Sequence, residues 1–113
     1  MAELELRTAS DTGQGYDVVL VRGDLDLRSH DQLRGLTGSS DLTAPLLVLD
    51  LTELGFLDSA GIGAIALARR QAEERGAELT LVAASPHVTK VLQVTGLDQT
   101  LRVCPSVDDV QAP

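Results

Sequence analysis

A strand, a long helix and a second strand follow one another in the middle of this chain and constrain its fold most strongly. Residues 46–51 are apolar at nearly every position, as in a strand covered on both faces of a sheet. Residues 59–75 then have helical periodicity up to Gly76, a favoured left-handed cap, and residues 79–83 form the next apolar strand. Two parallel strands joined by a helix make a right-handed crossover. The sequence therefore predicts an α/β fold.

The N-terminal third predicts a hairpin and a short helix. Residues 3–10 and 16–22 have strand patterns, and the turn residues of 11–15 separate them, so we expect two antiparallel strands. Ser29 and Gln32 then have the spacing of a capping box, which predicts the start of a helix.

The C-terminal third predicts a helix over residues 85–96, a strand near residues 101–103 and a short helix that begins at Ser106. Together these patterns predict a mixed sheet of four to five strands with an N-terminal antiparallel hairpin, packed by about four helices. We expect a single domain over residues 1–113, with its core at about residues 4–110.

Charge and composition disfavour several classes of function. The net charge of −8 disfavours direct binding to nucleic acid or to an anionic membrane, because both attract cationic surfaces. No apolar run approaches the roughly 18 residues of a membrane span, and the N-terminus lacks the pattern of a signal peptide, so we expect a cytoplasmic protein. The single cysteine, Cys104, predicts neither an internal disulfide nor a metal site.

Ser59 lies where the turn after the first central strand enters the long helix, and two interpretations of it remain open. A serine at this point can cap the free backbone N–H groups of the first turn, or it can carry a phosphate that faces the positive end of the helix dipole. The apolar front of the same helix, residues 60–68, is either buried or partly reserved for a partner.

Three patterns in the chain resemble catalytic motifs only partly. Gly61–Ala66 matches G-x-G-x-x-A, but no acidic residue ends the next strand and the chain is too short for a second nucleotide-binding half, so tight helix packing explains the glycines better. Ser59 is no hydrolase nucleophile elbow, because Leu57 breaks the G-x-S-x-G pattern. Asp24 and Asp26 are more typical of a capping or solvated loop than of an acid–base pair. None of the three patterns therefore favours catalysis.

Four motifs, in this order and spacing, identify the chain as similar to the STAS domain, and specifically to the bacterial anti-sigma factor antagonists. The resemblance spans about residues 4 to 110. The motifs that carry it are Gly23-Asp24-Leu25-Asp26, Leu47–Leu51, Phe56–Gly63, and Ser85-Pro86 with Val91-Leu92 and Thr95–Leu97.

The resemblance implies a binding module and not an enzyme, and this module is switched by phosphorylation. In the family, the unmodified antagonist binds an anti-sigma factor that is also a serine kinase, which releases a sigma factor. The kinase phosphorylates the serine of the D-S-x-G motif, here Ser59, and the complex dissociates until a serine phosphatase resets it. The aspartate that ends G-x-L-D, here Asp26, lies near this serine in the family. ATP and magnesium belong to the kinase, so the resemblance implies no cofactor for this chain.

The resemblance also implies a partner-binding surface around the motif serine. Its predicted members are Asp24, Asp26, Asp58, Ser59, Ala60, Gly61 and Ile62. Ala60 departs from the many family members that have serine or threonine there, which leaves Ser59 as the only hydroxyl of the motif. The alternative is a constitutive STAS scaffold or accessory subunit, of a stress-signalling complex or a lipid transporter, in which Ser59 is only a helix cap.

Overall fold

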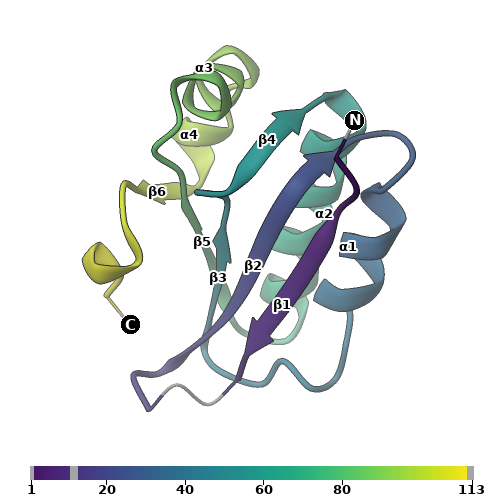
Figure 1. Cartoon of the computed structure of the whole chain (residues 1–113). Coiled ribbons are helices and arrows are strands. Elements are labelled where there is room, and N and C mark those ends of the chain that lie inside the picture. Colours follow the sequence, from purple (N-terminus) through teal and green to yellow (C-terminus); the bar gives the residue numbers. More distant parts are fainter. Residues whose placement is uncertain (1, 11–12, 112–113) are drawn as a thin grey trace.

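The computed structural model describes residues 2–10 and 13–111 and has an α/β architecture (Figure 1). Within these residues, six strands form one mixed sheet, and four α-helices and a 3₁₀ helix pack around it. The strands are β1 (Glu5–Ala9), β2 (Tyr16–Leu25), β3 (Leu46–Asp50), β4 (Leu54–Leu57), β5 (Glu78–Val82) and β6 (Arg102–Cys104). The helices are α1 (His30–Thr37), α2 (Ser59–Glu74), α3 (Pro86–Thr95), α4 (Leu97–Thr100) and the 3₁₀ helix η1 (Val107–Asp109).

The sheet has the order β1-β2-β3-β5-β6, and β4 pairs with β2 outside this path. β1 is antiparallel to β2, whereas the pairs β2–β3, β3–β5 and β5–β6 are parallel. These pairings confirm the predicted mixed sheet, its N-terminal hairpin and the parallel crossover through α2. The predicted number of four to five strands is wrong, because residues 54–57, expected to be a turn, form β4.

β2 pairs with two strands in succession along one edge, and Gly23 lies where the second pairing begins. Its φ of +95° favours glycine, and an added Cβ would collide with the carbonyl oxygen of Glu3. β2 pairs with β3 from Tyr16 to Leu20 and with β4 from Gly23 onward, and the β2–β4 register shifts between Gly23 and Asp24. The upper end of β2 is thereby aligned with the segment that leads into α2.

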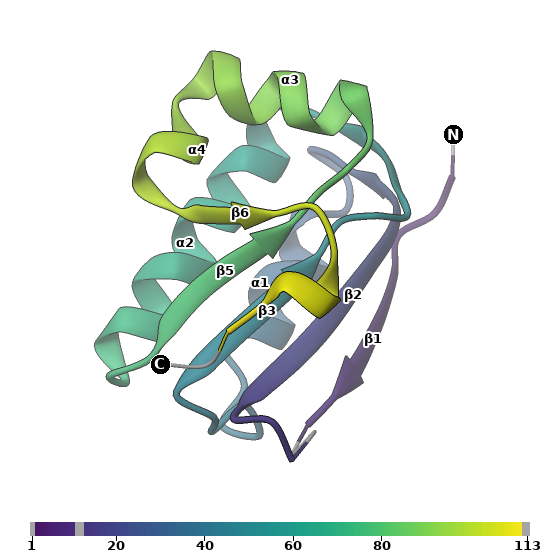
Figure 2. The same ribbon diagram turned by 90° about the vertical axis from the view of Figure 1, so that its left-hand side faces the viewer.

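The two faces of the sheet are covered differently, as Figure 2 shows with α1 and α2 behind the sheet and η1 in front. The larger core lies on the helical side, where Leu33 of α1 and Ile65 of α2 are fully buried against the sheet. A smaller cluster around Val48 and Val82 lies against Val107 of η1. No helix in the described part of the chain combines the length and the apolar character that a membrane crossing requires.

Most helix boundaries follow the predicted signals. Ser85 caps α3 by accepting a hydrogen bond from the Val88 N–H at 3.2 Å, and Gly76 after α2 has a φ of 79°. The prediction of a capping box at Ser29 is wrong, because the Ser29 side chain makes no hydrogen bond that caps α1. The short helix α4 was not predicted, because Gly96 indicated a stop and four residues are too few for a periodic pattern.

Candidate functional site

The candidate site lies at the upper end of the sheet in Figure 1, where β2 and β4 both end. These two strands are parallel, with Leu25 paired to Leu57. Asp26 and Asp58 follow these residues directly, so the β2–α1 loop and the start of α2 leave the sheet at the same edge. The missed strand β4 is therefore the element that brings the two aspartate-containing segments together.

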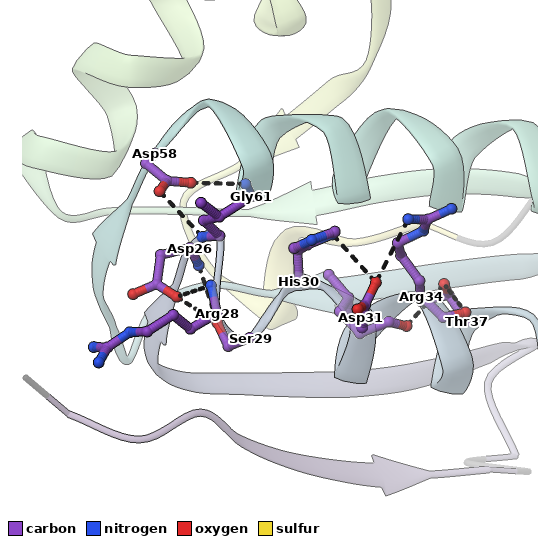
Figure 3. Close-up of polar contacts among 11 residues, drawn as sticks. Asp26, Arg28, Ser29, His30, Asp31, Arg34, Thr37, Asp58 and Gly61 are labelled. Atoms are coloured by element: carbon purple, nitrogen blue, oxygen red, sulfur yellow. Dashed lines mark hydrogen bonds and ion pairs between the residues drawn. The ribbon is translucent and has the colours of Figure 1, made fainter.

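Asp58 connects the two segments through its carboxylate (Figure 3). Oδ1 accepts a hydrogen bond from the Gly61 N–H at 3.0 Å, which makes Asp58 the N-cap of α2. Oδ2 accepts from the Leu27 N–H at 3.2 Å, in the loop before α1. The interpretation of Ser59 as the helix cap is therefore wrong, because the preceding residue performs this role.

Ser59 is the first residue of α2, and its side chain is exposed. Among the residues that the structure describes, its hydroxyl has no hydrogen-bond partner. The hydroxyl thus lies at the positive end of the dipole of a 16-residue helix, with the Asp58 carboxylate as its chain neighbour. A serine in this position is chemically available for modification.

Asp26 is buried, with an exposed fraction of 6%, and builds the loop between β2 and α1. Its Oδ1 accepts a hydrogen bond from the Arg28 N–H at 2.9 Å, and its carbonyl oxygen accepts from the His30 N–H at 2.9 Å. Ser29 Oγ accepts from the Asp26 N–H at 3.0 Å and donates to the Asp24 carbonyl oxygen at 2.8 Å. These bonds explain why Ser29 does not cap α1, and they give Asp26 mainly a positioning role for the loop.

Asp24 is half-buried in β2 and contacts the N-terminal segment. Its Oδ2 accepts a hydrogen bond from the Ala2 N–H at 3.1 Å. Asp24 and Asp26 both line a hollow of about 700 Å³ that also includes Arg28 and Gln32. In the part of the chain that is described, no group of three His, Cys, Asp or Glu side chains is arranged to hold a metal ion.

The two glycines at the start of α2 have different surroundings. A Cβ on Gly61 would lie 2.5 Å from the Leu25 carbonyl oxygen and 2.6 Å from Leu57 Cδ1, so Gly61 allows α2 to approach the sheet closely. Gly63 is exposed, and a Cβ there would meet nothing within 4 Å. The packing explanation of the G-x-G pattern is confirmed for Gly61 and wrong for Gly63. Burial leaves Gly61 little surface for a partner, whereas Ala60 is half-buried.

Two exposed apolar residues lie near the start of α2, and neither was among the predicted site residues. Leu27 is 72% exposed, and Phe56 is 41% exposed on β4. The Phe56 ring stacks on that of His87, with 6.0 Å between the ring centroids. Phe56 is the only phenylalanine of the chain, and this is the signal that could have drawn attention to it. Leu27 of the β2–α1 loop and Phe56 of β4 thus provide apolar surface near the start of α2 that a protein partner could cover.

Comparison with protein families agrees with this arrangement of strands and loops. The family model described as "Mlab, STAS domain" matches residues 9–104. The chain belongs to the STAS domain family. This STAS domain is 27% identical over 97 residues to a STAS-domain containing protein of Pseudomonas aeruginosa, covering 85% of this chain and 96% of the relative.

Solved structures show the same fold. An anti-sigma factor antagonist from Mycobacterium paratuberculosis superimposes with a TM-score of 0.83 at 28% identity, covering 95% of this chain and 90% of that chain. The anti-sigma factor antagonist SpoIIAA in its unphosphorylated form has a TM-score of 0.68 at 20% identity, covering 95% of this chain and 92% of that chain. The predicted STAS fold is confirmed.

Proposed function

We propose that this STAS domain is an anti-sigma factor antagonist that is not an enzyme and is switched off by phosphorylation of Ser59. In its unphosphorylated form it binds an anti-sigma factor with serine kinase activity in the cytoplasm, and a sigma factor is released. A serine phosphatase restores the binding form. The name of the M. paratuberculosis protein, at 28% identity, supports this assignment.

The observation that carries the proposal is the division of roles between Asp58 and Ser59. Asp58 alone caps α2, so the Ser59 hydroxyl is exposed and makes no hydrogen bond to the described residues. A kinase can therefore phosphorylate this hydroxyl without first disrupting the fold. Were Ser59 the cap, phosphorylation would remove a stabilising hydrogen bond of the helix.

The chemistry of the site predicts that phosphate acts on binding and not on folding. Phosphorylation adds roughly −1.5 to −2 charge at pH 7. The N-terminus of α2 offsets part of this by about 0.3–1 kcal/mol at an exposed site. A partner that covers Leu27 and Phe56 must exclude water from the region around Ser59, and a phosphate there resists desolvation. The charge added at Ser59 therefore causes the complex with the partner to dissociate.

The proposal is tested by affinity capture from the lysate of the native host, with four baits. These are the wild-type chain, Ser59→Ala, Ser59→Asp and, as a matched control for added charge, Ser40→Asp at an exposed serine between α1 and β3. We expect a serine-kinase anti-sigma factor with every bait except Ser59→Asp. Retention of the same protein by Ser59→Asp would contradict phosphorylation switching.

A second candidate is a constitutive accessory subunit of a stress-signalling complex or a lipid transporter. The family model that matches residues 9–104 is described as "Mlab, STAS domain". This description does not mention anti-sigma factor antagonists, and it therefore supports the accessory subunit as a second candidate. In that case all four baits retain one partner that has no kinase domain. The role of Ser59 as a cap, part of the original alternative, is excluded from this candidate because Asp58 caps α2.

A further inference from the structure

A groove of about 340 Å³ runs between α1 and α2, starting beside the candidate site. Leu27, whose N–H binds Asp58, lies at its upper end. The positions that line the groove recur every three to four residues, so each helix contributes one continuous stripe. They are Leu27, His30 and Arg34 from the α1 side, and Ala60, Gly63, Ala64, Leu67 and Arg70 from α2.

The upper part of the groove is apolar and lined by small residues. Ala60, Gly63 and Ala64 carry at most a methyl group, and a Cβ on Gly63 would find open space. Leu27 is 72% exposed and Leu67 is half-buried, so both retain apolar surface. Small residues permit a second helix to approach to the lower end of the usual 8–10 Å interaxial range.

Two arginines, Arg34 and Arg70, line the lower part of the groove. Figure 3 shows His30 and Arg34 between the ribbons of α1 and α2. Asp31 compensates the charge of Arg34 partly, since its Oδ1 lies 3.5 Å from Arg34 Nη1, and the same oxygen lies 3.6 Å from His30 Nδ1. Arg69 is paired with Glu73 at 2.7 Å, whereas Arg70 is exposed and has no ion pair among the described residues.

We propose that this groove binds an amphipathic helix of the partner, with its apolar face on Ala60–Leu67 and an acidic side chain at Arg70. The inference rests on the proposed function, because it names the part of the kinase that the antagonist would bind. Arg70, which has no ion pair among the described residues, lies beside this apolar stripe and favours an acidic side chain there, although the net charge of the chain is −8. From Ala60 to Arg70 the groove extends about 15 Å, which is three turns of helix.

The groove also connects the partner helix to the phosphorylation switch. Ala60 follows Ser59 directly, so one end of the bound helix lies next to the site of phosphate addition. A phosphate there resists the desolvation that a bound helix would require. The attraction at Arg70 and the phosphate at Ser59 therefore act on opposite ends of one ligand.

The test uses nuclear magnetic resonance of the full chain and needs no kinase. Two model helices of about 14 residues share one leucine stripe, flanked by glutamates in one peptide and by lysines in the other. We expect the glutamate peptide to shift the amide signals of Leu27, Gly63 and Leu67, although the overall charge of −8 favours the lysine peptide. Equal shifts with both peptides, or no shift at the groove, would overturn the proposal.

Two matched variants test whether Arg70 attracts the glutamate peptide. Arg70→Glu should weaken binding of this peptide by about fivefold or more. Arg102→Glu makes the same charge change at an exposed arginine of β6, outside the groove, and should leave that affinity unchanged. Similar weakening by both variants would overturn the proposal. If the glutamate peptide binds the groove but no kinase is captured from the lysate, the proposed function fails while the groove assignment stands.

Discussion

At the scale of single residues, the site depends on two neighbours with separate roles. The Asp58 carboxylate binds the N–H groups of Gly61 and Leu27, whereas the hydroxyl of Ser59 is exposed. The sequence alone could not assign these roles, because aspartate and serine are about equally good N-cap residues and stand side by side. In the structure, the extended backbone of Asp58, with φ −112° and ψ −172°, and its hydrogen bond from the Gly61 N–H show that Asp58 is the cap.

This assignment predicts different effects of two alanine substitutions on stability. Asp58→Ala removes the cap and the bond to the β2–α1 loop, and we expect the free energy of unfolding to fall by about 1–2 kcal/mol. Ser59→Ala removes an exposed hydroxyl without a partner and should change it by less than about 0.5 kcal/mol. Urea unfolding followed by circular dichroism measures both values. A larger loss for Ser59→Ala would make Ser59 the cap.

Asp26 shows a further limit of inference from the sequence. The motif identified it, but its exposure of 6% and its bonds within the loop come from the pairing of β2 with β4. Ser29 matched a capping box by spacing, yet its hydroxyl binds Asp24 and Asp26 instead. Spacing in the chain does not determine which of several nearby polar groups a side chain reaches in the folded protein.

At the scale of elements, the junction between β4 and α2 decides the geometry of the site. The central strands and α2 were predictable because their apolar patterns are long and regular. β4 was not, because it has four residues, includes a glycine, and pairs only with the far end of β2. β4 exists through its pairing with residues 23–25 of β2, which is a tertiary contact and leaves no periodic pattern in residues 54–57.

The close approach of α2 to β2 predicts opposite effects of two glycine substitutions. Gly61→Ala places a methyl group against the backbone of Leu25 and should destabilise the protein by about 1–3 kcal/mol. Gly63→Ala adds a methyl group in open space and should stabilise α2 by about 0.5–1 kcal/mol, because alanine favours helix.

Thermal unfolding of the two variants provides this comparison, with the wild-type chain as reference. Each variant adds one methyl group to the same turn of α2. The difference in stability between the two variants therefore reports the surroundings of positions 61 and 63 and not the chemistry of the substitution. A destabilised Gly63→Ala, or a neutral Gly61→Ala, would show that the start of α2 packs differently from the structure described.

At the scale of the whole molecule, the proposed switch does not require unfolding. The site occupies one end of the sheet, and the larger core around Leu33 and Ile65 lies between α1, α2 and the sheet. Charge added at Ser59 is therefore solvated and remains outside this core. The acidic net charge of −8 raises the cost of adding more negative charge, but salt screens such exposed charges beyond about 10 Å.

Ser59→Asp should consequently preserve the fold while it imitates part of the phosphate charge. We expect its free energy of unfolding to stay within about 0.5 kcal/mol of the wild type, since attraction to the helix N-terminus offsets repulsion by Asp58. Urea unfolding gives this value, and Ser40→Asp serves as the control for one added charge. A loss of several kcal/mol would indicate that phosphorylation acts by unfolding the protein.

The most direct measurement of the central claim is the dissociation constant of the captured anti-sigma kinase for two forms of this chain. One form is unmodified, and the other carries phosphate on Ser59, verified by mass spectrometry of the peptide that contains it. We predict that the phosphate raises the dissociation constant by about tenfold or more, which corresponds to about 1.4 kcal/mol. Equal constants for the two forms would contradict the account.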